Sequence, residues 1–180
     1  MSPYSAWPFL SDPSHPLLSA VWAVVIHGAL AVAAVAPILW RSRRRIRYTA
    51  VAFAGGSLLD LDHFIAAGSL SLHTIETLPG RPDTHSVAFV LVLGLLALLV
   101  TRRWQAAWAV FAVNLSHVLF DAAGGSEHVF YPLSHTDGLP WLACPLGTLA
   151  LFGASAVLAG GLRRRRSVVE PNSRGALSAG

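Results

Sequence analysis

Five stretches of apolar residues alternate with short polar segments along the chain, at 17–40, 48–67, 85–100, 104–122 and 139–162. An α-helix rises about 1.5 Å per residue, so about 20 apolar residues cross the roughly 30 Å hydrocarbon core of a bilayer. The first and last runs reach this length clearly, the third is short, and the second and fourth contain polar residues near their C-terminal ends. The pattern predicts an all-α, polytopic integral membrane protein with about five transmembrane helices.

Three basic clusters separate these runs, namely RSRRRIR at 41–47, Arg102–Arg103, and RRRR at 163–166. With five crossings, all three fall on the same side of the membrane, and basic loops prefer the cytoplasm. We therefore expect the N-terminus outside and the C-terminus in the cytoplasm. Residues 1–166 are predicted to form a single transmembrane domain, and 167–180, rich in Ser, Gly and Ala, a disordered cytoplasmic tail.

Composition supports a membrane protein, because 54% of the 180 residues are hydrophobic and only 12% are charged. The net charge of +4 does not indicate nucleic-acid binding, since the Arg residues flank apolar runs and are typical of topology signals. We expect a multi-pass protein of the inner or plasma membrane whose partners are membrane lipids. A homo-oligomer is compatible with so small a bundle, although no motif indicates one.

Histidines and aspartates recur inside the apolar runs at a common predicted depth in the membrane. Counted from the basic end of each helix, their heights are about 18 to 25 Å at 1.5 Å per residue. Ionised groups are costly at this depth, so they should face one another or a water-filled pocket. The residues are His27, Asp60, Asp62, His63, His85, His117 and Asp121.

The spacing of these residues favours metal binding. Asp60 and His63 are three residues apart, and His117 and Asp121 are four apart, so each pair shares one face of a helix. Asp62 points elsewhere, toward a second metal or toward Arg81. The chain has one cysteine, so imidazole and carboxylate must supply the ligands, which suits a divalent metal such as zinc or manganese. We predict all seven residues of this level as metal ligands.

Simpler interpretations remain open for each element of this site. DLDH at 60–63 is compatible with a helix end in water, and the His117–Asp121 pair with a hydrogen bond between helices. His85 is compatible with a helix start at which Thr84 is the N-cap. The other histidines, at positions 15, 73, 128 and 135, lie outside the runs in segments where His is common.

A metal with His and Asp ligands lowers the pKa of bound water, which is the usual basis of hydrolysis near neutral pH. A spare carboxylate then serves as general base, and Asp62 and Asp83 are the candidates. Arg81 is a candidate anion clamp for phosphate or carboxylate, or else a contact to a lipid headgroup. These three residues are our predicted catalytic groups.

The motifs DLDH at 60–63, RPDTHS at 81–86 and SHVLFD at 116–121, followed by Tyr131–Pro132, resemble the YdjM-like family of membrane-bound metal-dependent hydrolases. The resemblance covers about residues 27–132. It implies functional roles for Asp60, Asp62, His63, Arg81, His85, His117 and Asp121. Family membership sets an expectation of hydrolysis and does not by itself demonstrate activity.

The chain departs from the family pattern at three positions. Gly80 stands where the family has the first His of its H-R-G-x-T-H-S segment, Pro82 replaces the following Gly, and Leu59 replaces a Pro. One ligand of the family is therefore missing, or is supplied by a loop histidine at 73, 128 or 135.

The sequence thus favours a metal-dependent hydrolase acting on an ester or phosphoester of a lipid or lipid-linked substrate, with its site near the non-cytoplasmic face. The alternative is a divalent metal-ion carrier or sensor with the same ligands. A third interpretation, a structural protein with a polar packing layer, predicts no bound metal.

Overall fold

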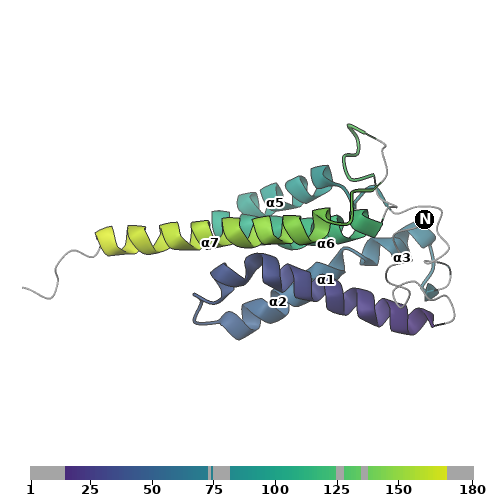
Figure 1. Cartoon of the computed structure of the whole chain (residues 1–180), viewed down its shortest axis with the longest axis horizontal. Coiled ribbons are helices and arrows are strands. Elements are labelled where there is room, and N and C mark those ends of the chain that lie inside the picture. Colours follow the sequence, from purple (N-terminus) through teal and green to yellow (C-terminus); the bar gives the residue numbers. More distant parts are fainter. Residues whose placement is uncertain (1–14, 73, 75–81, 125–127, 135–137, 170–180) are drawn as a thin grey trace, which may run out of the picture.

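The computed structural model describes residues 15–72, 74, 82–124, 128–134 and 138–169, and within these ranges every regular element is a helix. The helices form an elongated antiparallel bundle (Figure 1). They are α1 (Pro16–Leu39), α2 (Arg45–Leu58), α3 (Leu61–Ala67), α5 (Val87–Thr101), α6 (Trp104–Gly124) and α7 (Ala143–Val169). The predicted all-α fold is confirmed.

The predicted runs match the helices closely, except at the second and fifth. The first, third and fourth runs differ from α1, α5 and α6 by at most two residues at each end. The fifth helix begins at Ala143 instead of 139 and continues through the four arginines to Val169, into the predicted tail. The rest of that tail, 170–180, lies outside the described residues.

The second run does not form the single helix that apolar length predicted. It divides at Leu59 and Asp60 into α2 and α3. The turn tightens there, since the backbone N–H of Asp62 donates to the carbonyl of Leu59 at 3.1 Å and that of His63 to the carbonyl of Asp60 at 3.2 Å. Asp60 therefore lies at a junction between helices.

Helix α6 is the centre of the bundle and packs against α1, α2, α5 and α7. In Figure 1 the α1–α2 turn, the α5–α6 turn and the end of α7 lie toward the left, and α3 with the start of α7 lies toward the right. The three basic clusters thus belong to one end of the bundle, as predicted. Which side of a membrane this end faces stays a prediction.

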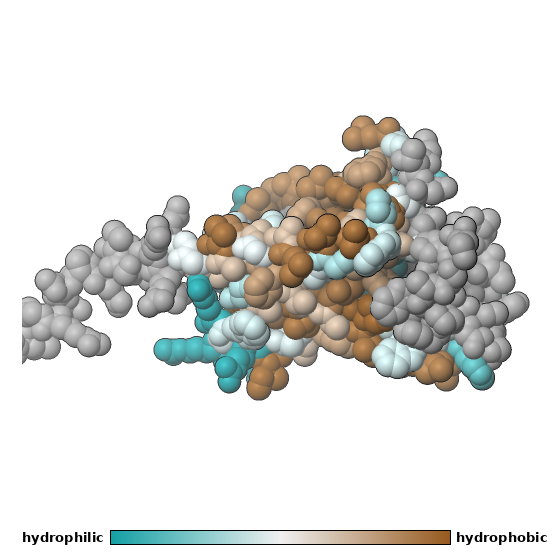
Figure 2. Space-filling model, in the orientation of Figure 1, coloured by the Kyte–Doolittle hydropathy of each residue, from teal (hydrophilic) through white to brown (hydrophobic). Residues whose placement is uncertain are grey.

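The outer surface of the helices is largely apolar (Figure 2). Four segments are long and apolar enough to cross a membrane, namely Leu17–Leu39, Arg45–Ala67, Trp104–Gly124 and Ala143–Gly161, and Val87–Thr101 is a shorter apolar helix. Large side chains such as Ile65, Val100 and Val157 are exposed on them. Because water would disfavour so much exposed apolar area, the surface fits a lipid environment.

Two apolar clusters fill the interior. One, which includes Ala31, Val35, Ala112 and Leu151, lies on the basic-end side of the intramembrane histidines in each helix. The other is built from Leu59, Val90, Val118, Ala122 and Val129. Together they fix α6 against its neighbours and so set the position of the polar residues between them.

Candidate metal centre

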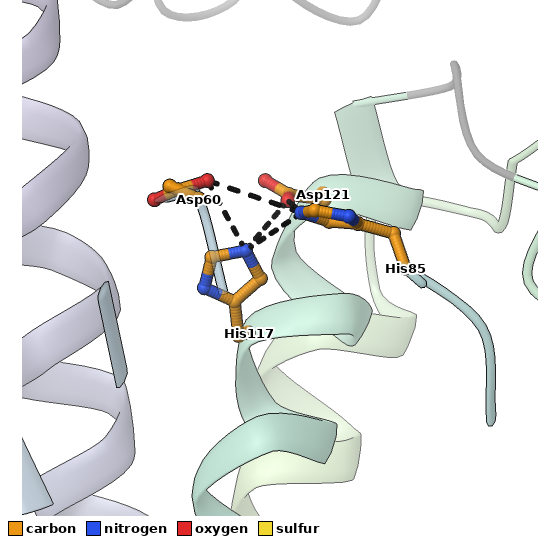
Figure 3. A group of neighbouring side chains, drawn as sticks. All are labelled: Asp60, His85, His117 and Asp121. Carbon is orange, nitrogen blue, oxygen red and sulfur yellow. Dashed lines mark hydrogen bonds and ion pairs between the residues drawn. The ribbon is translucent and has the colours of Figure 1, made fainter. Parts of the chain in front are cut away.

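Four polar side chains from three parts of the chain meet where α2 ends and α6 nears its C-terminus (Figure 3). Asp60 comes from the α2–α3 junction, His85 from the segment before α5, and His117 and Asp121 from α6. The last three are almost fully buried, at 1%, 0% and 2% exposure, whereas the Asp60 side chain is 27% exposed. This set, called the four-residue group below, offers one donor atom from each member within 4.8 Å of all the others.

The separations within the four-residue group fit a single ion. His117 Nε2 lies 3.0 Å from Asp121 Oδ2, 3.2 Å from His85 Nε2 and 3.4 Å from Asp60 Oδ1. His85 Nε2 lies 3.5 Å from Asp121 Oδ2 and 3.9 Å from Asp60 Oδ1. Four tetrahedral ligands about 2.0–2.1 Å from a zinc ion are roughly 3.3–3.4 Å apart, so these donors surround a space of that size.

The backbone of α2 orients His117. Its Nδ1 donates a hydrogen bond to the carbonyl oxygen of Gly56 at 2.6 Å, which leaves the lone pair on Nε2 facing Asp60 and Asp121. At Gly56, α2 lies close against α1 because glycine lacks a side chain. An added Cβ would lie 2.6 Å from the His27 carbonyl oxygen and 2.7 Å from Ala31 Cβ. The prediction that His117 and Asp121 share a face is confirmed by their contact.

His27 of α1 contacts the two carboxylates of the group from the other side. Its Nδ1 lies 3.1 Å from Asp60 Oδ2 and its Nε2 lies 3.2 Å from Asp121 Oδ1. These are not the carboxylate oxygens that face His117. His27 thereby holds both carboxylates in place, and its predicted role as a direct ligand stays a prediction.

Asp62, His63 and His85 form a second set of donors, again within 4.8 Å of one another. His63 Nδ1 lies 3.0 Å from Asp62 Oδ1, and His85 Nδ1 lies 3.3 Å from Asp62 Oδ2. His63 thus contacts Asp62 near the start of α3, and the predicted sharing of one ion by Asp60 and His63 stays a prediction.

Several buried atoms of these residues have no hydrogen-bond partner within the described part of the chain. They are His27 Nε2, Asp62 Oδ1, His63 Nδ1 and His85 Nδ1. Each lies within 3.0–3.3 Å of an oppositely charged or polar atom, but not in hydrogen-bond geometry. Buried polar atoms without a partner are costly, and a cation between Asp62, His63 and His85 would satisfy the lone pairs of three of these atoms. The donor set therefore fits a divalent metal such as zinc or manganese.

The remaining predicted residues lie elsewhere. Asp83 is exposed and belongs to neither set. Arg81 lies outside the described residues, as do His73 and His135, so their predicted roles have no structural counterpart here. The remaining candidate substitute for the missing family histidine, His128, is partly buried, and His15, a further histidine outside the runs, is exposed.

Sequence reasoning missed two residues that support the site. One is Gly56, for which the Gly55–Gly56 pair inside an apolar run was an available signal of close helix approach. The other is Thr84, whose hydroxyl donates to Asp62 Oδ2. Thr84 is not the N-cap of α5, because Ser86 fills that position and its Oγ accepts from the Phe89 N–H at 3.3 Å.

An apolar helical bundle with a buried group of His and Asp side chains defines a multi-pass membrane protein with a candidate divalent-metal site. The chain belongs to the YdjM inner membrane protein family, whose model matches residues 23–178. This match confirms the resemblance that the motifs indicated.

Two vertebrate proteins are also similar to the chain. Transmembrane protein 267 of Xenopus laevis is 37% identical over 112 residues, covering 60% of this chain and 48% of that protein. Transmembrane protein 267 of Danio rerio is 34% identical over 112 residues, covering 60% and 47%. The chain thus spans about half the length of these relatives. No solved structure matches it.

Proposed function

We propose that this protein is a membrane-bound metal-dependent hydrolase. The observation that carries the proposal is the four-residue group, in which two imidazole nitrogens lie 3.0 to 3.9 Å from each other and from two carboxylate oxygens, and all four donors lie within 4.8 Å of one another. Such donors and separations suit zinc or manganese. A cation held there would polarise an ester or phosphoester oxygen and lower the pKa of a water molecule.

The protein's own residues supply binding, orientation and access. Gly56 orients His117, and His27 contacts both Asp60 and Asp121. His85, His117 and Asp121 are shielded from solvent, so an approaching reactant reaches the group from the side of Asp60, its most exposed member. Of the predicted catalytic groups, Asp62 contacts a member of the group, namely His85, and Arg81 lies outside the described residues.

The surroundings of this entrance support a lipid or lipid-linked substrate. Helix α3, which directly follows Asp60, exposes Leu61 at 53% and Ile65 at 82%. In the segment that follows α6, at the same end of the bundle, Leu133 and Phe130 are 93% and 48% exposed. Apolar side chains beside a polar group favour a ligand with an apolar tail and a hydrolysable head.

The rival function, a divalent-ion carrier, requires polar groups that continue from the site toward the basic end. On that side the described helices pack an apolar cluster that includes Ala31, Val35, Ala112 and Val113. Among the described residues, no buried charged side chain belongs to this cluster. A site open on one side only favours an enzyme over a carrier.

The first test is the metal content of detergent-purified protein, measured by inductively coupled plasma mass spectrometry without chelator. Wild type is compared with His117→Ala, Asp60→Ala and the matched control His15→Ala, which removes an exposed histidine outside the site. We expect bound metal in wild type and control, and loss of that metal in the two site variants.

Hydrolysis is then measured on phospholipid and lipid-linked phosphoester substrates with and without added zinc or manganese. Metal-dependent turnover that is absent in His117→Ala supports the enzyme. Bound metal without turnover on any ester substrate would support the carrier or sensor. Metal-free wild type would leave a structural polar layer as the remaining explanation.

A further inference from the structure

The imidazole of His85 lies between two sets of donors. Its Nε2 faces the four-residue group, 3.2 Å from His117 Nε2 and 3.5 Å from Asp121 Oδ2. Its Nδ1 faces Asp62 Oδ2 at 3.3 Å. The two ring nitrogens therefore point toward different sets, and the ring is 1% exposed.

If only the four-residue group bound a metal, Nδ1 of His85 should donate a hydrogen bond to a carboxylate or carbonyl, as metal-bound histidines almost always do. Asp62 is within reach, yet Nδ1 makes no hydrogen bond in the described part of the chain. The same is true of Asp62 Oδ1 and His63 Nδ1, both buried and 3.0 Å apart. Three donor atoms thus face one another without the bonds that would satisfy them.

We propose that Asp62, His63 and Nδ1 of His85 hold a second divalent cation, so that the His85 imidazole bridges two metals. This proposal rests on the proposed function for the four-residue group and extends it to a two-metal site. Both nitrogens of a bridging imidazole bind metal, and its remaining N–H proton passes to solvent on binding. The metals would stand farther apart than the roughly 3.5–4 Å of closely bridged pairs, because the ring separates them.

The local contacts suit this role. The Thr84 hydroxyl donates to Asp62 Oδ2, which orients the carboxylate and leaves Oδ1 facing His63. The rings of His63 and His85 meet edge to face, with centroids 4.8 Å apart and planes at 80°. His63 is 7% exposed, so its Nδ1 has little access to water as an alternative partner.

The two positions differ in their number of protein ligands. The first has four protein ligands, as structural zinc sites do, and the second has three, as catalytic zinc sites do. The Asp62 side chain is 18% exposed, which gives the second position contact with solvent. The second position would therefore leave room for a water molecule or a second substrate oxygen beside the cation of the four-residue group, and Asp62 would act as a ligand rather than as the free general base.

The test is metal stoichiometry per full-length chain in detergent, after dialysis against zinc. Four variants are compared with wild type. Asp62→Asn and His63→Gln change only the second position, and Asp121→Asn changes only the first. His15→Ala is the control. We expect two ions in wild type and control, and one in each of the three other variants. Two second-position variants are included so that one misfolded protein does not decide the result.

Magnetic coupling gives a second readout. In wild type loaded with Cu²⁺, two ions bridged by imidazole couple, and the electron paramagnetic resonance signal should account for much less copper than is bound. In His63→Gln the remaining ion should give its full signal. If wild type binds one ion, and His63→Gln and Asp62→Asn still bind that ion, the proposed second metal position is wrong.

The outcomes separate this inference from the proposed function. Two ions with no hydrolysis would keep the bridged pair and reject the enzyme. One ion with metal-dependent hydrolysis would keep the enzyme and reject the pair. A wild type with no bound ion would reject both.

Discussion

Replacing Gly56 by Ala tests whether close packing of α1 on α2 sets the geometry of the site. The new Cβ would lie 2.6 Å from the His27 carbonyl oxygen and 2.7 Å from Ala31 Cβ. Carbon atoms in contact prefer about 3.5–4.0 Å, so the two helices must separate by about 1 Å. Both neighbours belong to α1, whose backbone cannot move aside as a flexible side chain does.

The expected cost follows from two opposing effects. Overpacking a tight contact costs about 1–3 kcal/mol, and Ala in place of Gly inside a helix recovers about 0.5–1 kcal/mol. We expect a net loss of about 1–2 kcal/mol in the free energy of unfolding. The Gly56 carbonyl that orients His117 would also shift, and the loss of such an outer contact typically lowers metal affinity about 10–100-fold.

The assay combines thermal unfolding in detergent with zinc titration, for Gly56→Ala and for Gly153→Ala. Gly153 is the matched control, because a Cβ there meets nothing within 4 Å. The control should unfold at or slightly above the wild-type temperature and bind zinc normally. Equal unfolding temperatures and zinc affinities in the two variants would refute the proposed role of Gly56.

Three further predictions follow from the same structure. Ser155→Ala removes the acceptor for Trp108 Nε1 (2.8 Å), so stability in thermal unfolding should fall by about 1–3 kcal/mol while metal stoichiometry stays unchanged. Zinc at 100 times its dissociation constant should stabilise wild type by about 2.7 kcal/mol, and equal stabilisation of His117→Ala would contradict binding at this site. The membrane orientation can be tested in cells with single-cysteine variants in which Cys144 is replaced by Ala. A membrane-impermeant thiol reagent should label Leu133→Cys in intact cells, but Ser42→Cys only after the cells are permeabilised. The reverse pattern would overturn the predicted orientation.

The fold could be predicted from the sequence because one physical requirement dominates it. A bilayer demands long apolar helices, and basic clusters mark their ends, so the bounds of α1, α5 and α6 follow within one or two residues. The start of α7 was missed, since residues 139–142 are as apolar as the helix that follows. Apolar length alone does not distinguish helical from extended residues at a membrane boundary.

The sequence indicated which histidines and aspartates lie at the candidate site, but not how they divide into two sets of donors. Counting the rise per residue placed His85, His117 and Asp121 at one level, and they meet there. The contact of Asp62 and His63 with His85 follows the break at Leu59, which has no Pro or Gly of its own to reveal it. The contact between His117 Nδ1 and a backbone carbonyl likewise cannot be predicted from residue types.

The break between α2 and α3 helps to explain how three of four consecutive residues, Asp60, Asp62 and His63, serve two sets of donors. In a continuous helix Asp60 and Asp62 would point about 200° apart, and His63 would follow Asp60 on its face. The tight turn at Leu59–Asp60 instead directs Asp60 toward α6 and brings Asp62 and His63 together against the other edge of His85. His85 then lies between them because the chain before α5 turns, with the His85 N–H donating to the Pro82 carbonyl at 2.9 Å, before Ser86 caps the helix. The arrangement therefore depends on one helix break and one turn, which together place a single imidazole between two sets of carboxylate and histidine ligands.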